Sequence, residues 1–374
     1  MRVTNLTSTL IAAALLAAGV AAAPAVHAGD ATDLVIAVEV PLTGPQASNG
    51  KDMLRGVRLA ARQANATGGV LGQRVRVVAI DDQADPDLAR ASVVAARKAK
   101  AVAVIGPYNS SVGVINLPLY LDAGIVPVHM TSTNDTDGEG VTVQPKNNQI
   151  SPVEAAYVES VGARSVAMLV DPSTYTQGMA NRLRSALTSQ GVTVTSIPIV
   201  EGQSDYSAQV AQALQGAPDL VYVSTYYPEG ARIAQSLATS KLPTRCLMGL
   251  ANVDPDFVDQ AGVAASQRCV FSGVPEAAQM PGARAKAYVA AYTKAFGTKP
   301  GVWGIFTYDS ARMLFARIAK AGRTEFTQVL TSLQNVRDFA GATGTISIDP
   351  STGNRIDVPV YILRVNDRGV FIVT

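Results

Sequence analysis

Short apolar runs alternate with longer stretches of mixed apolar and polar residues from Leu34 almost to the end of the chain. Runs that are apolar on both faces are typical of strands buried in a parallel sheet. In the first half they fall at residues 34–40, 75–80, 102–105 and 126–128. Helical periodicity fills the intervals at 52–65, 86–98 and 112–122. This rhythm predicts βαβ units and a parallel sheet whose four strands are all buried.

The same rhythm restarts after Pro152. Expected helices are 152–161, 177–190, 206–214 and 230–238, and expected strands are 165–170, 193–199, 220–223 and 246–248. Further helices are expected at 283–296, 304–321 and 325–333, and a closing strand pair at 345–348 and 358–365 with a turn at 352–354. The second half is therefore a second α/β unit, similar to the first in plan but not in sequence.

The N-terminus has the layout of an export signal. Arg2 precedes an apolar run, and small residues at Val26 and Ala28 are followed by Gly29. We expect residues 1–28 to be a secretory signal peptide cleaved after Ala28, which sends the mature chain to the periplasm. The apolar run of about 14 residues is shorter than the roughly 20 that a spanning helix needs, so no membrane insertion is expected.

The composition of the mature chain shows a nearly balanced charge and only two cysteines. Without Arg2 the mature chain of 346 residues holds 30 basic against 29 acidic residues, so nothing electrostatic points to nucleic acid or an anionic membrane. A chain of this length is expected to form two domains. Cys246 and Cys269 are the only cysteines, and in an exported protein they predict one disulfide; two buried free thiols are the alternative.

Catalytic motifs are missing. No G-x-G-x-x-G fingerprint occurs, and the nearest phosphate-loop pattern, Gly44 to Gly50-Lys51-Asp52, is one residue too long and ends in an acid. The mature chain has one histidine, His129, too few together with two cysteines for a tetrahedral metal site. We therefore expect no enzyme, no cofactor and no metal.

Several blocks resemble the periplasmic branched-chain amino acid (Leu/Ile/Val) binding family. The most specific is Asn-Ala-Thr-Gly-Gly-Val-Leu-Gly at 65–72, which leads to Asp-Asp-Gln-Ala-Asp-Pro at 81–86. The residue types also suit the expected element boundaries, since Gly68 and Gly69 can end a helix and Asp85-Pro86 can begin one. Other matching segments are 37–45 with Gly50 and Gly56, 105–111, 131–133, 226–229 and 341–365, so that the resemblance covers nearly the whole mature chain.

The resemblance implies a type I periplasmic binding fold. It has two Rossmann-like lobes joined by three interlobe crossovers, with the ligand in the cleft: lobe 1 at 30–146 plus 276–345, and lobe 2 at 147–275 plus 346–374. The implied function is a solute-binding receptor of an ABC importer that holds an amino acid, or a similar small carboxylate, by hinge closure. As a monomer it would then dock on the transporter permease. The same fold also suits an extracytoplasmic ligand sensor, or a binder of an amine-free carboxylate or amide.

By family position, the ligand-binding residues are Tyr108, Asn109, Ser110, Ser111, Thr131, Ser132, Thr133, Tyr175, Tyr226 and Asp254. Ser110 and Ser111 begin a helix after a strand, where hydroxyl groups and the helix dipole suit a carboxylate; helix capping is the alternative role. Residues 131–133 follow the next strand, and their alternative role is a plain polar loop. Tyr175 and Tyr226 would cover the ligand from lobe 2, or belong to the core near the hinge.

One position departs from the family. An acid that pairs with the ligand's ammonium group usually stands two residues after a glycine in the loop that follows the strand at 246–248. Here Gly249-Leu250-Ala251 puts an alanine there. Either Asp254, Glu39 or Glu229 replaces the acid, or the ligand carries no ammonium group, because burying an unpaired ammonium costs several kcal/mol.

Overall fold

The computed structural model describes residue 1 and residues 33–240 and 242–374. The predicted signal peptide and its cleavage after Ala28 lie outside the described residues, apart from Met1. No helix in the described part of the chain is long and apolar enough to span a membrane.

The first half of the chain builds a five-stranded parallel sheet with the order β2-β1-β3-β4-β5. Its strands are β1 (Leu34–Val40), β2 (Val75–Asp81), β3 (Ala103–Ile105), β4 (Val126–His129) and β5 (Val141–Thr142). The associated helices are α1 (Ala47–Ala66), α2 (Ala89–Lys98), α3 (Ser110–Asp122), α10 (Ala283–Phe296), α11 (Gly304–Ala321) and α12 (Phe326–Gln334).

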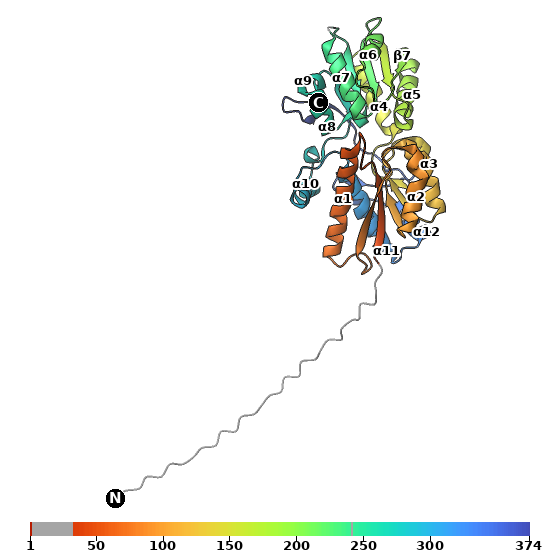
Figure 1. Ribbon diagram of the computed structural model, residues 1–374, viewed down its shortest axis with the longest axis vertical. Coiled ribbons are helices and arrows are strands. Elements are labelled where there is room, and N and C mark those ends of the chain that lie inside the picture. The colour runs from red at the N-terminus through yellow and green to blue at the C-terminus, as the bar shows by residue number, and fades with distance from the viewer. Residues whose placement is uncertain (2–32, 241) are drawn as a thin grey trace. The chain divides into compact units, whose positions relative to one another are not determined.

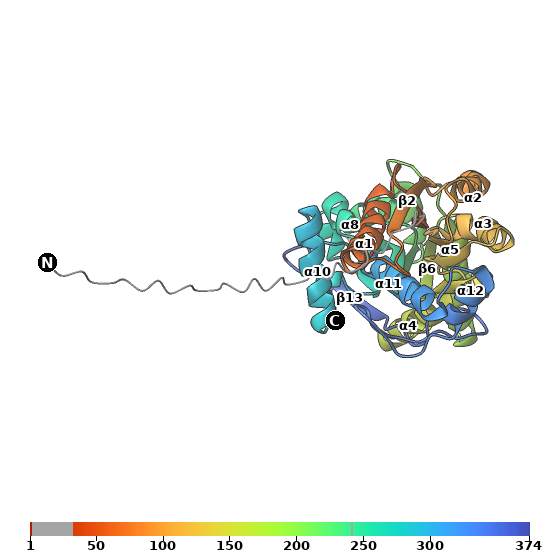
Figure 2. The same cartoon turned by 90° about the horizontal axis from the view of Figure 1, so that it is seen from below.

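The two faces of this sheet bury alternate residues of β1. Ile36 and Val38 face the core that contains α1 and α11, whereas Val35 and Ala37 pack with α2 and α3. Figures 1 and 2 show α2 and α3 side by side, away from α1. The close crossing of α1 and α11 requires Gly56, since a Cβ there would lie 2.0 Å from the Gly304 carbonyl oxygen.

The second half of the chain builds a seven-stranded sheet with the order β14-β13-β10-β9-β8-β6-β7. Its strands are β6 (Ser165–Val170), β7 (Thr193–Pro198), β8 (Leu220–Ser224), β9 (Arg245–Met248), β10 (Val270–Gly273), β13 (Tyr361–Val365) and β14 (Phe371–Val373). Its helices are α4 (Asn147–Ser160), α5 (Thr174–Ser189), α6 (Ser207–Ala213), α7 (Tyr227–Thr239), α8 (Pro255–Ala261) and α9 (Val263–Ser266). The β6 side chains alternate between a core with α4 and α5 and a core with α6, α7 and α8.

The chain passes between the two sheets three times: between β5 and α4, between β10 and α10, and before β13, which pairs with β10. This confirms the predicted α/β class with two lobes and three crossovers. Cys246 in β9 and Cys269, next to β10, form the predicted disulfide, with 4.5 Å between their Cα atoms.

Two predictions about strands were wrong. We expected β2 to be fully buried, but it is an edge strand and several of its residues are partly or fully exposed. The predicted pairing of 345–348 with 358–365 was also wrong: β12 (Gly344–Ile346) pairs with β11 (Phe339–Gly341), and β13 pairs with β10 and β14. A turn does form at the predicted place, between the antiparallel bridge partners Ile348 and Arg355. Asn354 then bridges to Thr142 of β5, so the chain is still beside the first sheet here and crosses to the other lobe only before β13.

Candidate functional site

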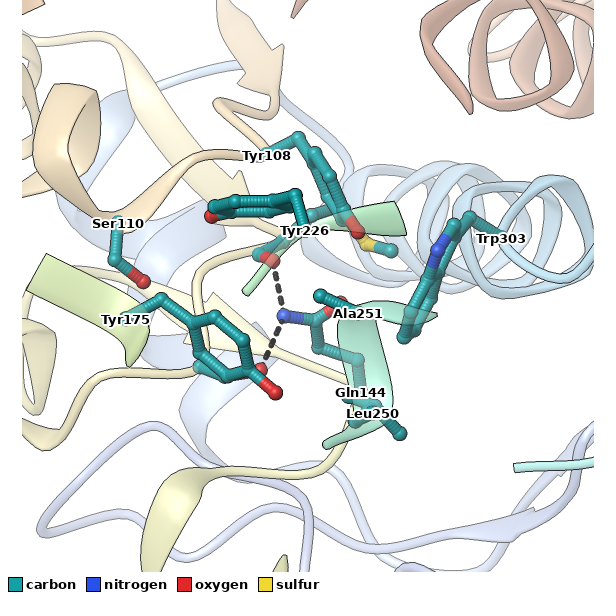
Figure 3. A pocket seen from close by; sticks show the side chains of 10 residues that line it. Tyr108, Ser110, Gln144, Tyr175, Tyr226, Leu250, Ala251 and Trp303 are labelled. Atoms are coloured by element: carbon teal, nitrogen blue, oxygen red, sulfur yellow. Dashed lines mark hydrogen bonds between the residues drawn. The ribbon is translucent and has the colours of Figure 1, made fainter. Parts of the chain in front are cut away.

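A narrow cavity of about 10 Å³ lies between the carboxyl ends of strands from both sheets. We call it the cleft cavity. Its ten lining residues are Tyr108, Ser110, Met130, Ser132, Gln144, Tyr175, Tyr226, Leu250, Ala251 and Trp303 (Figure 3). In open parallel sheets this edge is where loops converge and where ligands bind.

Ser110 marks one end of the cleft cavity. It is the first residue of α3, and its buried Oγ accepts a hydrogen bond from the Thr133 backbone N–H at 3.3 Å. The helix N-terminus places partial positive charge at this end of the cavity. A hydroxyl group at the start of a 13-residue helix is well suited to hold a carboxylate.

Four aromatic rings line much of the rest. Tyr108 lies 5.7 Å from Trp303 and 6.2 Å from Tyr226, and Tyr226 lies 5.8 Å from Tyr175, measured between ring centroids. The hydroxyl of Tyr175 is buried and has no hydrogen-bond partner among the described residues. Burial raises its pKa well above the usual value, so Tyr175 stays neutral and can donate a hydrogen bond.

Trp303 is held in place by a cap on α11. The buried Asp52 carboxylate on α1 accepts a hydrogen bond of 2.6 Å from the Gly304 backbone N–H. A carboxylate at a helix N-terminus satisfies an amide that lacks a partner within the helix. Trp303 immediately precedes this amide, so the cap holds its backbone, and its indole lies at the opposite end of the cavity from Ser110 (Figure 3).

Gln144 projects into the middle of the cavity (Figure 3). Its Nε2 donates to the Ser132 Oγ at 3.0 Å and to the Met130 carbonyl oxygen. Its Oε1 is buried and has no partner among the described residues. The amide therefore presents one free acceptor for a neutral donor on a ligand.

None of the ten lining residues carries a charge. Ala251, only 4% exposed, lies in the short helical turn Leu250–Asn252 after β9 and adds a methyl group to the wall. The buried acids close to this region are engaged elsewhere. Glu154 accepts hydrogen bonds from Ser272 and Tyr222, and burial raises its pKa to about 7.

The three acids that we considered as replacements also lie off the cavity wall. Asp254 caps α8 by accepting a hydrogen bond of 2.7 Å from the Asp256 N–H, and burial raises its pKa to about 8. Glu39 accepts hydrogen bonds from Asn116 and Tyr120. Glu229 accepts one from the Gly202 N–H and lines a separate hollow.

That hollow, of about 440 Å³, is bounded by both lobes and also includes Asn109 and Ser111. Asn109 donates to the Gln46 Oε1 at 3.0 Å. The Ser111 hydroxyl bonds with the Thr174 hydroxyl of the other lobe and accepts from the Thr174 N–H at 3.0 Å. These two residues therefore face the hollow and the interlobe contact, not the cleft cavity.

A family model described as periplasmic binding protein matches residues 33–369. The chain belongs to the periplasmic binding protein family. It is 28% identical over 358 residues to the Leu/Ile/Val-binding protein BraC3 of Rhizobium johnstonii, covering 93% of both chains. It is 27% identical over 330 residues to Leu/Ile/Val-binding protein homolog 2 of Brucella abortus, covering 85% of this chain and 86% of the relative.

Solved structures of type I periplasmic binding proteins share the fold. The leucine binding protein LivK of Thermotoga maritima superposes with a TM-score of 0.84 at 24% identity, covering 91% of this chain and 97% of that one. A Rhodopseudomonas palustris solute binding protein in complex with 3,4-dihydroxybenzoic acid gives 0.81 at 22% identity, covering 91% and 96%. Another from R. palustris, in complex with benzoate, gives 0.81 at 17% identity, covering 91% and 95%.

The predicted site residues divide into two groups, those that line the cleft cavity and those that do not. Tyr108, Ser110, Ser132, Tyr175 and Tyr226 come together on the cleft cavity. The others, which are Asn109, Ser111, Thr131, Thr133 and Asp254, do not line it.

Thr131 and Thr133 are buried beside the cavity and are satisfied locally. The Thr131 hydroxyl bonds with His129 and Thr136, and the Thr133 hydroxyl donates to Asp135. Ser110 and Ser111 do not cap α3, which was their alternative role. Asn109 is the N-cap residue of this helix, and its side chain makes no capping hydrogen bond.

Sequence reasoning missed Gln144, Trp303, Met130 and Leu250. Trp303 is the only tryptophan and directly precedes a predicted helix, a signal that could have marked it. Gln144 follows β5, a strand of only two residues and therefore too short to show any periodicity.

Proposed function

We propose that this protein is an exported, periplasmic substrate-binding receptor of an ABC importer. Its ligand is a small carboxylate that carries no ammonium group and has an apolar body, such as an aromatic or branched aliphatic acid. The single observation that carries this specificity is the uncharged wall of the cleft cavity, with Ala251 in place of an acid.

The two ends of the cavity fit such a ligand. Ser110 and the N-terminus of α3 would hold the carboxylate. Trp303, Leu250 and Ala251 would contact the apolar body at the other end. An α-ammonium group would enter a site without a counter-charge, which costs several kcal/mol.

Related proteins support both parts of the proposal. Relatives named as Leu/Ile/Val-binding proteins support the receptor role. Fold neighbours in complex with benzoate and 3,4-dihydroxybenzoic acid support a carboxylate without an amine, since the same architecture holds such acids.

Receptor action would come from closure of the lobes, without chemistry. We propose that lobe 1 (30–146 plus 276–345) and lobe 2 (147–275 plus 346–374) close as a monomer over the ligand and that the permease recognises the closed form. The hydrogen bond of 2.6 Å from the Tyr227 hydroxyl to the Pro45 carbonyl oxygen, together with the Ser111–Thr174 pair, would stabilise that form. A ligand shifts such an equilibrium by its differential affinity for the two states.

A thermal-shift panel on residues 29–374 tests the proposal. Matched pairs differ only in the amine: leucine with 4-methylpentanoate, and phenylalanine with 3-phenylpropanoate; benzoate and 4-hydroxybenzoate complete the panel. A ligand at 100 times its dissociation constant adds about 2.7 kcal/mol of stability. We expect amine-free acids to raise the melting temperature and their amino-acid partners to leave it unchanged. Stabilisation by the amino acids would refute the specificity, and stabilisation by no carboxylate at all would refute the receptor role proposed for this cavity.

A further inference from the structure

A second cavity of about 150 Å³ lies at the crossovers, and we call it the hinge cavity. Val274 and Met280 line it from the crossover between β10 and α10, and Val358 and Tyr361 line it from the crossover that leads into β13. None of its lining residues belongs to the cleft cavity. It is therefore a separate space, bounded by segments that connect the lobes.

Arg355 is the charged residue on its wall, and it is 2% exposed. Its Nη2 donates to the Thr343 and Thr345 carbonyl oxygens at 3.0 and 2.9 Å. Its Nη1 donates to the Thr343 hydroxyl at 2.9 Å and to the Val143 carbonyl oxygen at 3.4 Å. Every one of these acceptors is neutral.

The guanidinium charge has no ion-pair partner among the described residues, and its Nε has no hydrogen-bond partner there. Asp309 is the acidic residue whose charge acts on Arg355, but the two residues form no ion pair. The Asp309 carboxylate oxygens instead accept hydrogen bonds from the Ala342 and Thr343 backbone N–H groups. Asp309 also forms an ion pair with Arg312 at 3.6 Å. Asp309 therefore balances part of the guanidinium charge without direct contact, and the buried Nε–H of Arg355 remains a donor open to an anion.

The remaining wall defines what kind of anion fits. Val274, Met280, Phe306 and Val358 are all buried and apolar. Apolar surface of this kind accommodates a hydrocarbon body, and ligand pockets commonly combine such walls with one charged group.

We infer that the hinge cavity is a second ligand site, which takes a small amphipathic carboxylate with its charge toward Arg355 and its hydrocarbon chain among Val274, Met280 and Val358. Arg355 also contacts the Val143 carbonyl in the first crossover, so the site touches all three connections between the lobes. A ligand bound there changes the equilibrium of lobe closure if it prefers one arrangement of these connections.

Calorimetric titration with octanoate tests the site, with octanamide as the uncharged match. We expect one octanoate per chain, and octanamide binding weaker by about tenfold or more because it lacks the charge-assisted bond. Failure of millimolar octanoate to bind, or equal binding of both compounds, would overturn the inference.

Two substitutions locate the binding. Met280→Trp fills the hinge cavity and is expected to abolish octanoate binding, whereas Val94→Trp, at an exposed position on α2, is the matched control and is expected to preserve it. Octanoate bound in the cleft cavity instead would survive Met280→Trp and be lost in Ala251→Glu, which would contradict the assignment. Arg355→Gln is expected to remove the preference for octanoate over octanamide. If that variant does not fold, the comparison of octanoate with octanamide on the wild type and the Met280→Trp variant still test the site.

Discussion

At the scale of single residues, Ala251 is one of the ten uncharged residues that line the cleft cavity. Its side chain lines a wall that contains no acidic residue. Asp254, three positions later in the sequence, caps α8 instead of lining the cavity. Ala251→Glu should introduce an ammonium partner. We expect it to weaken binding of amine-free carboxylates by about tenfold or more through like-charge repulsion and to create measurable affinity for leucine.

Calorimetry on the wild type, Ala251→Glu and Ala251→Gln measures this. The glutamine variant is the control because it has nearly the same size and no charge. If the glutamate and glutamine variants behave alike, volume and not charge governs the site, and the role given to Ala251 is refuted.

Ser110 should contribute a charge-assisted hydrogen bond to the ligand carboxylate. Ser110→Ala is expected to lower affinity for the best acid of the thermal-shift panel by about 1–3 kcal/mol, roughly 5- to 150-fold. Ser185→Ala, at an exposed position on α5, should leave affinity unchanged. Unaltered affinity in Ser110→Ala would remove this residue from the ligand site.

Glu39 should make stability depend on pH. Burial, and then the charge of Asp82, raise the pKa of Glu39 to about 8, above its ordinary value of 4.5. The folded protein therefore holds a proton that the unfolded chain releases, and the stability from this proton, complete below about pH 4.5, is lost as pH rises toward 8.

Glu39→Gln keeps an amide that can bond with Asn116 and Tyr120 but cannot ionise. Between pH 5 and pH 8 we expect the wild type to lose about 1–3 kcal/mol more unfolding free energy than this variant, measured by urea denaturation. Glu159→Gln, on the exposed end of α4, should follow the wild type. Parallel profiles of the wild type and Glu39→Gln would contradict the assignment.

At the scale of elements, the disulfide joins two neighbouring strands of the seven-stranded sheet. Cys246 lies in β9 and Cys269 directly before β10, so the bond closes a loop of 23 positions. We expect no free thiols in the oxidised protein and two after reduction, with a loss of about 3 kcal/mol in unfolding free energy.

Thiol titration and urea denaturation with and without reductant measure this. The double variant with alanine at both positions is the control, since its stability should not respond to reductant. Two thiols in the oxidised wild type would disprove the bond.

The elements also show what sequence could and could not predict. β1 was predicted residue for residue because both its faces are buried and apolar. The edge position of β2 was missed because its composition is equally apolar, and the neighbours that a strand acquires are a property of the whole sheet. The closing strands were paired wrongly because the turn at 352–354 suggested a long hairpin. Only one antiparallel bridge, between Ile348 and Arg355, forms across it, and the chain then crosses to pair β13 with β10.

At the scale of the whole molecule, the cleft cavity joins residues far apart in sequence. Tyr108 and Trp303 are 195 positions apart, and their rings lie 5.7 Å from each other. The resemblance to the family located five of the ten lining residues, since each follows a strand that could be recognised. Gln144 required the structure, because the two-residue strand before it shows no periodicity. Met130 and Leu250 lie in loops already recognised from the sequence, but nothing in the sequence shows which side chains of a loop face the cavity.

The uncharged wall of the cleft cavity should make it bind a carboxylate without an ammonium group. Calorimetric titration of residues 29–374 with 4-methylpentanoate and with leucine tests it most directly, because the two ligands share their carboxylate and branched chain and differ in the amine. We expect 4-methylpentanoate to bind at least about 100-fold more tightly than leucine, a difference of about 2.7 kcal/mol. Equal or tighter binding of leucine would contradict it.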